Sequence, residues 1–571
     1  MHGLREEWRQ FRLLARSGSF RLLDSEMLSP GGDMSASAAN VLAVLVAFGM
    51  ALSLMLLYKY VFHLPPAFTV AVGAITWPDK QYLLAASMLA SGFVLVMTWD
   101  RLFPDRRDAM MFCPLPVHLR THFAVRLAGM AGMLFAVVVA ANIVSFVAFP
   151  TYMMSTEQPR ISWTVYAWIH ARTVFAASAF TFFALLALEG ALLLLLPYRL
   201  FQRLSAAVQL LLLFGMLFLF VLEPNVTPMM MANPLNATLV RLLPPVWFLA
   251  LYQQALGSTL PVVQELAELA KSAIALAVFA ALATYTLGYR KAVRQALEEA
   301  DAVPAARGAG FGRLSGALLR RVAGTGVRGA VFGFVARTMV RHRRNRLILA
   351  VYLSLALGYT LGDVARLVRD GGRQLYTPSA GLAAVSLVLL FFTLLGMRVL
   401  FTIPVELKAN WIFRLTECAD FALYRAAVRR VMLWLGAAPV CVLALAAHTA
   451  LWGWRYALLH VAMLLLVALL LVEILLGGFA KIPFTCSFLP GRAELKTRLG
   501  VWAIVFSLGT ALVTNLEAAM LVRPRGYVFC YALGCAVLAW MVRERRRFER
   551  EQWGVVYEDR GEFLVGLGLR T

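Results

Sequence analysis

Residues 456–479, YALLHVAMLLLVALLLVEILLGGF, form an apolar run in which Glu473 is the one charged side chain. About 20 consecutive apolar residues allow a helix to cross the hydrocarbon core of a bilayer. This run is long enough to cross, and it contains no Pro to interrupt a helix. The stretch therefore predicts a membrane-spanning helix, and it serves as a template for the rest of the chain.

About twelve comparable runs recur along the sequence. They predict an all-α integral membrane protein with about twelve transmembrane helices. The expected spans are 37–62, 81–103, 124–149, 164–196, 204–222, 264–289, 346–367, 379–402, 428–449, 456–479, 499–521 and 527–542.

The composition excludes a water-soluble enzyme. Of 571 residues, 61% are hydrophobic and 15% are charged, whereas soluble domains are about half apolar and about a quarter charged. The net charge of +23 comes from arginines in the segments between the apolar runs, so it indicates inner loops and not a nucleic-acid surface. The six cysteines have no regular spacing and predict neither a disulfide framework nor a zinc site.

The distribution of Lys and Arg predicts the orientation. With the N-terminus inside, most of the basic residues fall on the inner side of the membrane, as the positive-inside rule requires. We therefore expect both termini to be cytoplasmic. Arginine far outnumbers lysine, a bias of GC-rich bacterial genomes, so the expected location is a bacterial inner membrane.

The second half of the chain repeats the plan of the first. We expect a first six-helix half at 1–289, a basic Gly-rich cytoplasmic linker at 290–330, a second six-helix half at 331–542 and a basic tail at 543–571. Duplicated halves related by an axis along the membrane normal are a common transporter plan, with the substrate path between them.

A basic amphipathic segment precedes each set of six spans. Trp8 and Phe11 lie on one face of the first segment and Arg12 on another, while Arg337, Arg341 and Arg344 line the polar face of the second. Such elbow helices lie along the inner membrane surface, with arginines among anionic lipid head groups. The alternative is an ordinary basic flank beside each first span.

Polar side chains recur at matching positions of two spans. Trp163 to His170 corresponds to Trp454 to His460, and each stretch leads into a span with one carboxylate, Glu189 or Glu473. Ionisable groups inside spans are costly and often functional. The alternative is that they form structural hydrogen bonds between helices.

The expected outer segment 223–263 contains an apolar stretch that is too short to span. It includes Pro244, Pro245, Trp247 and Tyr252. A stretch of this length indicates a re-entrant segment that caps a translocation path, or else a passive interfacial helix.

Motifs of catalysis are missing from the sequence. It has no phosphate-binding loop G-x-x-x-x-G-K-[ST], no H-E-x-x-H and no G-x-S-x-G. The inner-loop residues His118, Arg120 and His122 lack a nucleophile beside them. We therefore expect a transport subunit and not an enzyme, with no metal site and no cofactor bound by this chain.

The inner loop between the second and third spans reads DRRDAMMFCPLPVHLR at 105–120. This loop, the segment 243–252 and the elbow helices resemble the membrane subunit of an ATP-binding-cassette exporter of the type-2 permease kind, in the fused form with two six-span halves. The second-half loop, 403–430, lacks the Leu-Pro-Val of the first.

The resemblance implies a mechanism and partners. Two copies of a separate ATPase subunit would bind ATP and Mg²⁺ and dock on the inner loops, while membrane lipids surround the spans and nucleic acid has no role. The residues expected to form the docking surface are Asp105, Arg106, Arg107, Pro114, Leu115, Pro116, Arg120, Lys408, Arg414 and Glu417.

Two other classes remain open. An ion-coupled transporter of the major-facilitator kind also has a 6+6 plan, and residues 99–107, WDRLFPDRR, are superficially similar to its loop motif, but position 96 is Val and not Gly. A polytopic membrane enzyme is the second alternative. The apolar spans favour a lipid-like or amphipathic substrate over a sugar or an ion.

Overall fold

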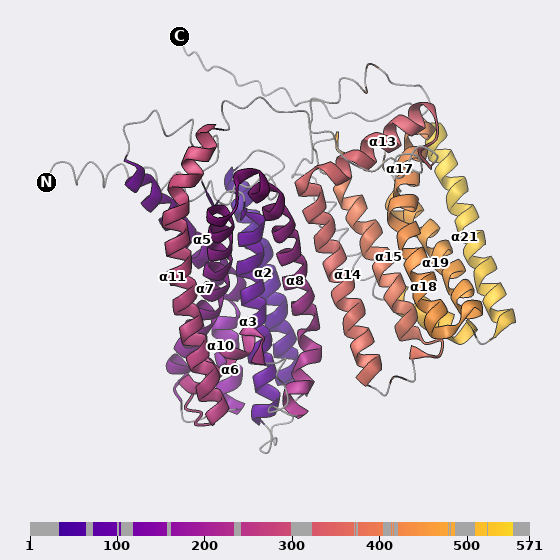
Figure 1. Ribbon diagram of the computed structural model, residues 1–571. Helices are drawn as coiled ribbons and strands as arrows, with labels where there is room; N and C mark the ends of the chain where they lie inside the picture. The colour runs from indigo at the N-terminus through magenta and orange to yellow at the C-terminus, as the bar shows by residue number, and fades with distance from the viewer. Residues whose placement is uncertain are drawn as a thin grey trace, which may run out of the picture. The chain divides into compact units, whose positions relative to one another are not determined.

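The computed structural model describes residues 34–63, 72–99, 102–103, 118–156, 161–232, 241–298, 322–369, 372, 375–402, 413, 415, 421–477, 479, 481–485, 509–521 and 523–551. All regular structure in these ranges is helical (Figure 1). Within them, 11 helical stretches are long and apolar enough to cross a membrane. The prediction of an all-α, multi-pass membrane protein is therefore confirmed.

The chain divides into two compact units, Met1–Ala306 and Arg307–Thr571. The described helices of unit 1 are α2 (Met34–Leu57), the π-helical η1 (Tyr58–His63), α3 (Val72–Met97), α5 (Leu119–Asn142), α6 (Ser145–Thr156), α7 (Trp163–Leu195), α8 (Tyr198–Ala232), α10 (Pro244–Ala255) and α11 (Pro261–Glu298). Those of unit 2 are α13 (Gly326–Arg341), α14 (Arg343–Arg369), α15 (Ala380–Leu400), α17 (Phe421–Val431), the π-helical η5 (Met432–Ala437), α18 (Ala438–Trp452), α19 (Trp454–Leu475) and α21 (Pro524–Glu551).

The third expected span, 124–149, is not one continuous helix. It breaks between α5 and α6, where the Ser145 hydroxyl donates to the Asn142 carbonyl at 3.0 Å and Asn142 Nδ2 donates to the Val138 carbonyl at 3.0 Å. Side chains of this kind compete with helical backbone hydrogen bonds. The expected span 499–521 is described only over 509–521, where it is helical.

Unit 1 is built around α7, which packs against α3, α5, α6, α8, α10 and α11. The short α10 lies inside this assembly, against α3, α7 and α11. Two prolines open α10 at its first turn, where a missing N–H costs nothing. Its Phe248, Leu249 and Tyr252 are almost fully buried, so α10 is a packed element of the unit.

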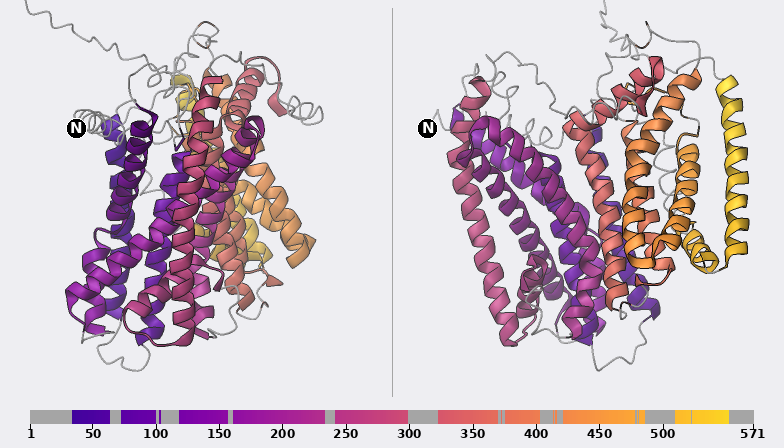
Figure 2. Two further views of the ribbon diagram at one scale, coloured as in Figure 1. Left: turned by 60° about the vertical axis from the view of Figure 1, so that its left-hand side comes forward. Right: turned by 45° about the vertical axis from the view of Figure 1, so that its right-hand side comes forward.

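In unit 2, α15 is the most enclosed span, with 72% of its most apolar window buried, whereas the corresponding figure for α21 is 6%. The two views in Figures 1 and 2 agree that α21 stands at the edge of the unit. Its apolar side chains, such as Phe529 and Trp540, are exposed. In a bilayer, lipid tails cover such a face.

The helix α13 crosses the ends of the unit 2 spans and does not run beside them (Figure 1). His342 has an extended backbone and separates α13 from α14. Phe332, Val335 and Met339 of α13 are buried, and Arg337 and Arg341 are exposed. The two faces expected from the sequence are thus present, and Arg344 lies partly exposed in α14.

Close contact between α2 and α5 gives a first prediction. A Cβ added at Gly49 of α2 would lie 1.9 Å from the Ala141 carbonyl oxygen of α5, so Gly49→Ala must push the helices apart. We expect it to destabilise the protein by about 1–3 kcal/mol, measured as a lower melting temperature in detergent. Gly132→Ala is the matched control, because that Cβ would meet nothing within 4 Å; an equal effect of both substitutions would contradict the packing argument.

Candidate functional site

Much of the docking surface expected from the sequence lies outside the described residues. This applies to Asp105, Arg106, Arg107, Pro114, Leu115, Pro116, Lys408, Arg414 and Glu417, and to Trp8, Phe11 and Arg12 of the first elbow segment. Arg120 is described and is exposed in the first turn of α5. The polar side chains inside the two units can be examined directly.

His170 of α7 is the centre of a buried hydrogen-bond chain in unit 1. Its Nδ1 lies 3.4 Å from the Tyr252 hydroxyl of α10, and its Nε2 lies 3.5 Å from the Ser145 hydroxyl of α6. Ser145 lies 3.3 Å from Asn142 Oδ1, and Ser87 of α3 lies 2.8 Å from that same oxygen. The chain thus joins α3, α5, α6, α7 and α10 through neutral groups.

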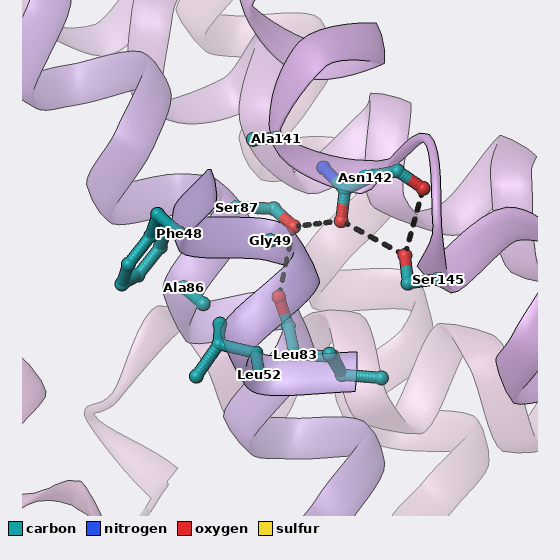
Figure 3. A pocket seen from close by; sticks show the side chains of 9 residues that line it. All are labelled: Phe48, Gly49, Leu52, Leu83, Ala86, Ser87, Ala141, Asn142 and Ser145. Carbon is teal, nitrogen blue, oxygen red and sulfur yellow. Dashed lines mark hydrogen bonds between the residues drawn. The ribbon is translucent and has the colours of Figure 1, made fainter. Parts of the chain in front are cut away.

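A small cavity lies beside this chain, lined by residues of α2, α3, α5 and α6 (Figure 3). It leaves about 10 Å³ for the centre of a water molecule, which is room for about one water. Figure 3 shows Ser87, Asn142 and Ser145 with their hydrogen bonds on its wall. A bound water is the ligand that a polar cavity of this size suits.

A buried lysine lies next to this chain. Lys80 of α3 is 1% exposed, and its Nζ lies 5.0 Å from the centre of the Tyr252 ring. With the Gln253 amide turned so that its oxygen accepts, that oxygen lies 3.0 Å from both Lys80 Nζ and Trp77 Nε1. Lys80 was missed in the sequence because it stands one residue before the expected span at 81–103.

A further hydrogen bond lies at the N-terminal end of α10. Trp247 Nε1 donates to the Arg241 carbonyl at 2.5 Å, and Pro244 and Pro245 are partly buried. Of the residues expected to form a re-entrant cap, Tyr252 alone reaches the His170 chain. Through Tyr252, α10 is connected to the polar interior of unit 1.

Unit 2 contains a second histidine-centred group, around the residue that the sequence pattern pairs with His170. His460 Nδ1 of α19 lies 2.8 Å from Glu517 Oε1 in the helix 509–521, and His460 Nε2 lies 2.6 Å from the Ser386 hydroxyl of α15. The His448 ring of α18 lies 4.2 Å from the His460 ring, centre to centre. All four residues are at most 4% exposed. The match between the segments Trp163 to His170 and Trp454 to His460 indicated His460 as a polar site. It did not indicate that Ser386 and His448 would be its neighbours.

Glu473, further along α19, belongs to a cluster of charges from four helices. Its Oε1 lies 2.6 Å from Arg545 Nη1 of α21 and 2.9 Å from Arg429 Nε of α17. Glu549 of α21 lies 3.7 Å from Arg425 Nε. Two arginines cap the end of α19, because Arg398 Nε donates to the Leu475 carbonyl at 2.7 Å and Arg425 Nη2 to the Leu476 carbonyl at 3.1 Å.

This cluster (Arg398, Arg425, Arg429, Glu473, Arg545 and Glu549, here the arginine clamp) ties α15, α17, α19 and α21 together.

Glu189, which the sequence pattern pairs with Glu473, is 2% exposed on α7. Next to it, a Cβ at Gly190 would lie 2.6 Å from Thr284 Oγ1, so α7 and α11 are closely packed there.

The clusters offer little scope for covalent or metal chemistry. In the described part of the chain, no group of three or more His, Cys, Asp or Glu residues suits a metal ion. Ser386, His460 and Glu517 are connected in the order of a hydrolase triad, but Ser386 is 3% exposed and lies inside α15. The backbone N–H groups around it are used by the helix, so they are not available as oxyanion donors.

Comparison of the chain with protein-family models, with curated proteins and with solved structures gives no match.

The arginine clamp gives the second prediction. The Glu473 side chain is 2% exposed, whereas those of Arg429 and Arg545 are 26% and 14% exposed. Glu473→Gln removes the carboxylate that both arginines face. Breaking a fully buried ion pair costs about 3–5 kcal/mol; the arginines here keep some contact with solvent, so we expect a smaller but clear fall in melting temperature and in the yield of monodisperse protein.

The control for this prediction is Glu544→Gln on the same helix as Arg545. The pair Arg547–Glu544 is exposed, at 75% and 61% of the side chains, and exposed pairs contribute little. Equal stability of Glu473→Gln and Glu544→Gln would show that the clamp is not a stabilising element.

Proposed function

We propose that this chain is the membrane subunit of an ATP-binding-cassette exporter, built as two six-span halves and forming the translocation path. The proposal combines the type-2 permease resemblance of the sequence with the all-α, multi-pass architecture. ATP and Mg²⁺ would be bound by two separate ATPase copies, docked on inner loops. Both termini would then be cytoplasmic, in a bacterial inner membrane.

The observation that carries the proposal is the contact of α13 with the inner loop of unit 2. Phe334 of α13 and Phe413 of the segment between α15 and α17 lie with ring centres 5.1 Å apart in an edge-to-face pair. The apolar face of α13 also packs against α17, through the core that contains Phe332, Phe421 and Val428. An elbow helix in direct contact with a docking loop is what a permease driven from its inner face requires.

The arginine clamp supports the same mechanism. The helix α17 follows the inner loop, and its Arg425 and Arg429 are joined to α19 and α21. A displacement of the loop by an ATPase would therefore move α13 through Phe413 and move α19 and α21 through the clamp. Buried ion pairs resist separation because unpaired charges are costly there, so the linkage is stiff.

The third prediction tests docking. The double variant Arg106→Glu with Arg107→Glu reverses two charges of the first inner loop, so it should abolish co-purification with a candidate ATPase subunit while membrane insertion is retained. Unchanged co-purification and unchanged transport would refute the docking assignment. Transport that persists without the ATPase and collapses with the ion gradient would instead favour an ion-coupled transporter.

The fourth prediction tests force transmission in unit 2. Phe334→Ala removes the edge-to-face pair with Phe413, so ATPase binding should be retained while stimulation of ATP hydrolysis by the reconstituted membrane subunit falls several-fold. Phe135→Ala is the control: it removes a comparable ring pair, with Phe175 at 5.7 Å, far along the sequence from any inner loop of unit 2. A fall of equal size in both variants would mean that the contact has no coupling role.

A further inference from the structure

The group around His460 has hydrogen-bond partners suited to two protonation states. Ser386 Oγ lies 2.6 Å from His460 Nε2 and 3.3 Å from the Ala383 carbonyl. When Nε2 is unprotonated, the serine hydroxyl donates to it. When Nε2 carries a proton, Nε2–H donates to Ser386 Oγ, and the hydroxyl hydrogen turns to the Ala383 carbonyl. Neither state leaves a donor of this group without an acceptor.

The other ring nitrogen of His460 provides the balancing charge. Nδ1 lies 2.8 Å from Glu517 Oε1, so Nδ1–H donates to the carboxylate in both states. An isolated carboxylate inside a bilayer is costly, and an ion pair is less so. Addition of a proton to His460 Nε2 converts a buried negative charge into a neutral imidazolium–carboxylate pair.

The neighbouring elements limit the group to one added proton. His448 Nδ1 of α18 lies 2.8 Å from the Ala444 carbonyl and donates to it, and the His448 side chain is 3% exposed. A second positive charge on His448 would face an imidazolium across 4.2 Å between ring centres. On α21, the Tyr527 hydroxyl donates to the Leu459 carbonyl at 2.6 Å, and Tyr531 stacks on Tyr527.

Unit 1 provides an internal comparison. The sequence pattern pairs His170 with His460, but the ring nitrogens of His170 lie against the hydroxyls of Ser145 and Tyr252. Lys80 lies on the other side of Tyr252, with Nζ 5.0 Å from the ring centre. A cation close to a histidine opposes its protonation, whereas a carboxylate favours it. The two histidines therefore face opposite electrostatic environments.

From this geometry we infer that Ser386, His460 and Glu517 form a proton-binding site inside unit 2. The step is a simple addition: a proton from hydronium forms a bond with His460 Nε2, and one water is released. The Ser386 hydroxyl keeps its hydrogen and turns it from His460 Nε2 to the Ala383 carbonyl. The inference concerns this group alone and does not depend on which motor drives transport.

Trp452 supplies a reporter within the group. Its ring centre lies 4.5 Å from that of His448 and 5.6 Å from that of His460, and an imidazolium quenches indole fluorescence more strongly than a neutral imidazole does. The experiment is a pH titration of the fluorescence of the full-length protein in nanodiscs. Because the chain has 13 tryptophans, the signal is the difference between wild type and Trp452→Phe.

We expect this difference signal to be quenched as the pH falls, and we expect this pH dependence to be absent in the His460→Gln background. In Glu517→Gln its midpoint should move to lower pH by about 1–3 pH units, because the imidazolium loses its carboxylate. Ser386→Ala is a small change that keeps the site measurable if Glu517→Gln does not fold. It should also move the midpoint, because His460 Nε2 loses its hydrogen-bond partner. His170→Gln is the matched control and should leave the signal unchanged.

Several results would overturn the assignment. A difference signal that does not titrate would make the group a fixed structural network. A titration that persists in His460→Gln would assign the proton to another residue. A titration that is unchanged in both Glu517→Gln and Ser386→Ala would show that these two side chains do not stabilise the added proton. Covalent labelling of Ser386 by a fluorophosphonate probe would show a nucleophilic serine and a hydrolase site.

Discussion

The structure depends on one constraint: inside a bilayer, every backbone N–H and C=O must be bonded within the protein. Long helices meet this requirement locally, which is why the apolar runs become helices of the lengths observed. Side-chain polar groups cannot be satisfied in this way and need partners from other helices. Each unit gathers its buried polar groups into connected clusters, and these clusters hold together helices that apolar contact alone would join weakly, because lipid competes for such contact.

The polar groups described around His170 and in unit 2 meet this need with different chemistry. Unit 1 connects α3, α5, α6, α7 and α10 through hydroxyl, amide and imidazole groups around His170. Unit 2 uses ionisable groups, with Glu517 on His460 and a clamp of arginines on Glu473. Hydrogen bonds between neutral groups can exchange partners at modest cost in free energy, whereas buried charges strongly favour one pairing. His170 and His460, which the sequence pattern pairs, thus differ in their partners: His170 lies against two hydroxyls, whereas His460 lies against a hydroxyl and a carboxylate.

The sequence predicted the helices well because their signal is long and local. The runs at 164–196 and 456–479 correspond closely to α7 and α19. The break between α5 and α6 was not predicted, since it depends on side-chain bonds of Asn142 and Ser145 within an apolar stretch. His170, His460 and Glu473 were found from the repeat, but Ser386, His448 and the arginines that pair with Glu473 were not. Those partners come from helices distant in sequence, and a periodic pattern carries no information on which faces meet.

Both polar clusters of unit 2 lie on α19, with His460 and Glu473 separated by about 20 Å along the helix axis at 1.5 Å per residue. A helix of this length is a stiff connector, because bending it strains hydrogen bonds that lipid cannot replace. A shift of α17 or α21 that pulls on Glu473 must therefore displace His460 relative to Ser386 and Glu517. The distances of 2.6 and 2.8 Å at His460 leave little freedom before a bond is lost. His460 and Glu473 thus share one stiff element, α19, through which a movement at the clamp would reach the inferred proton site.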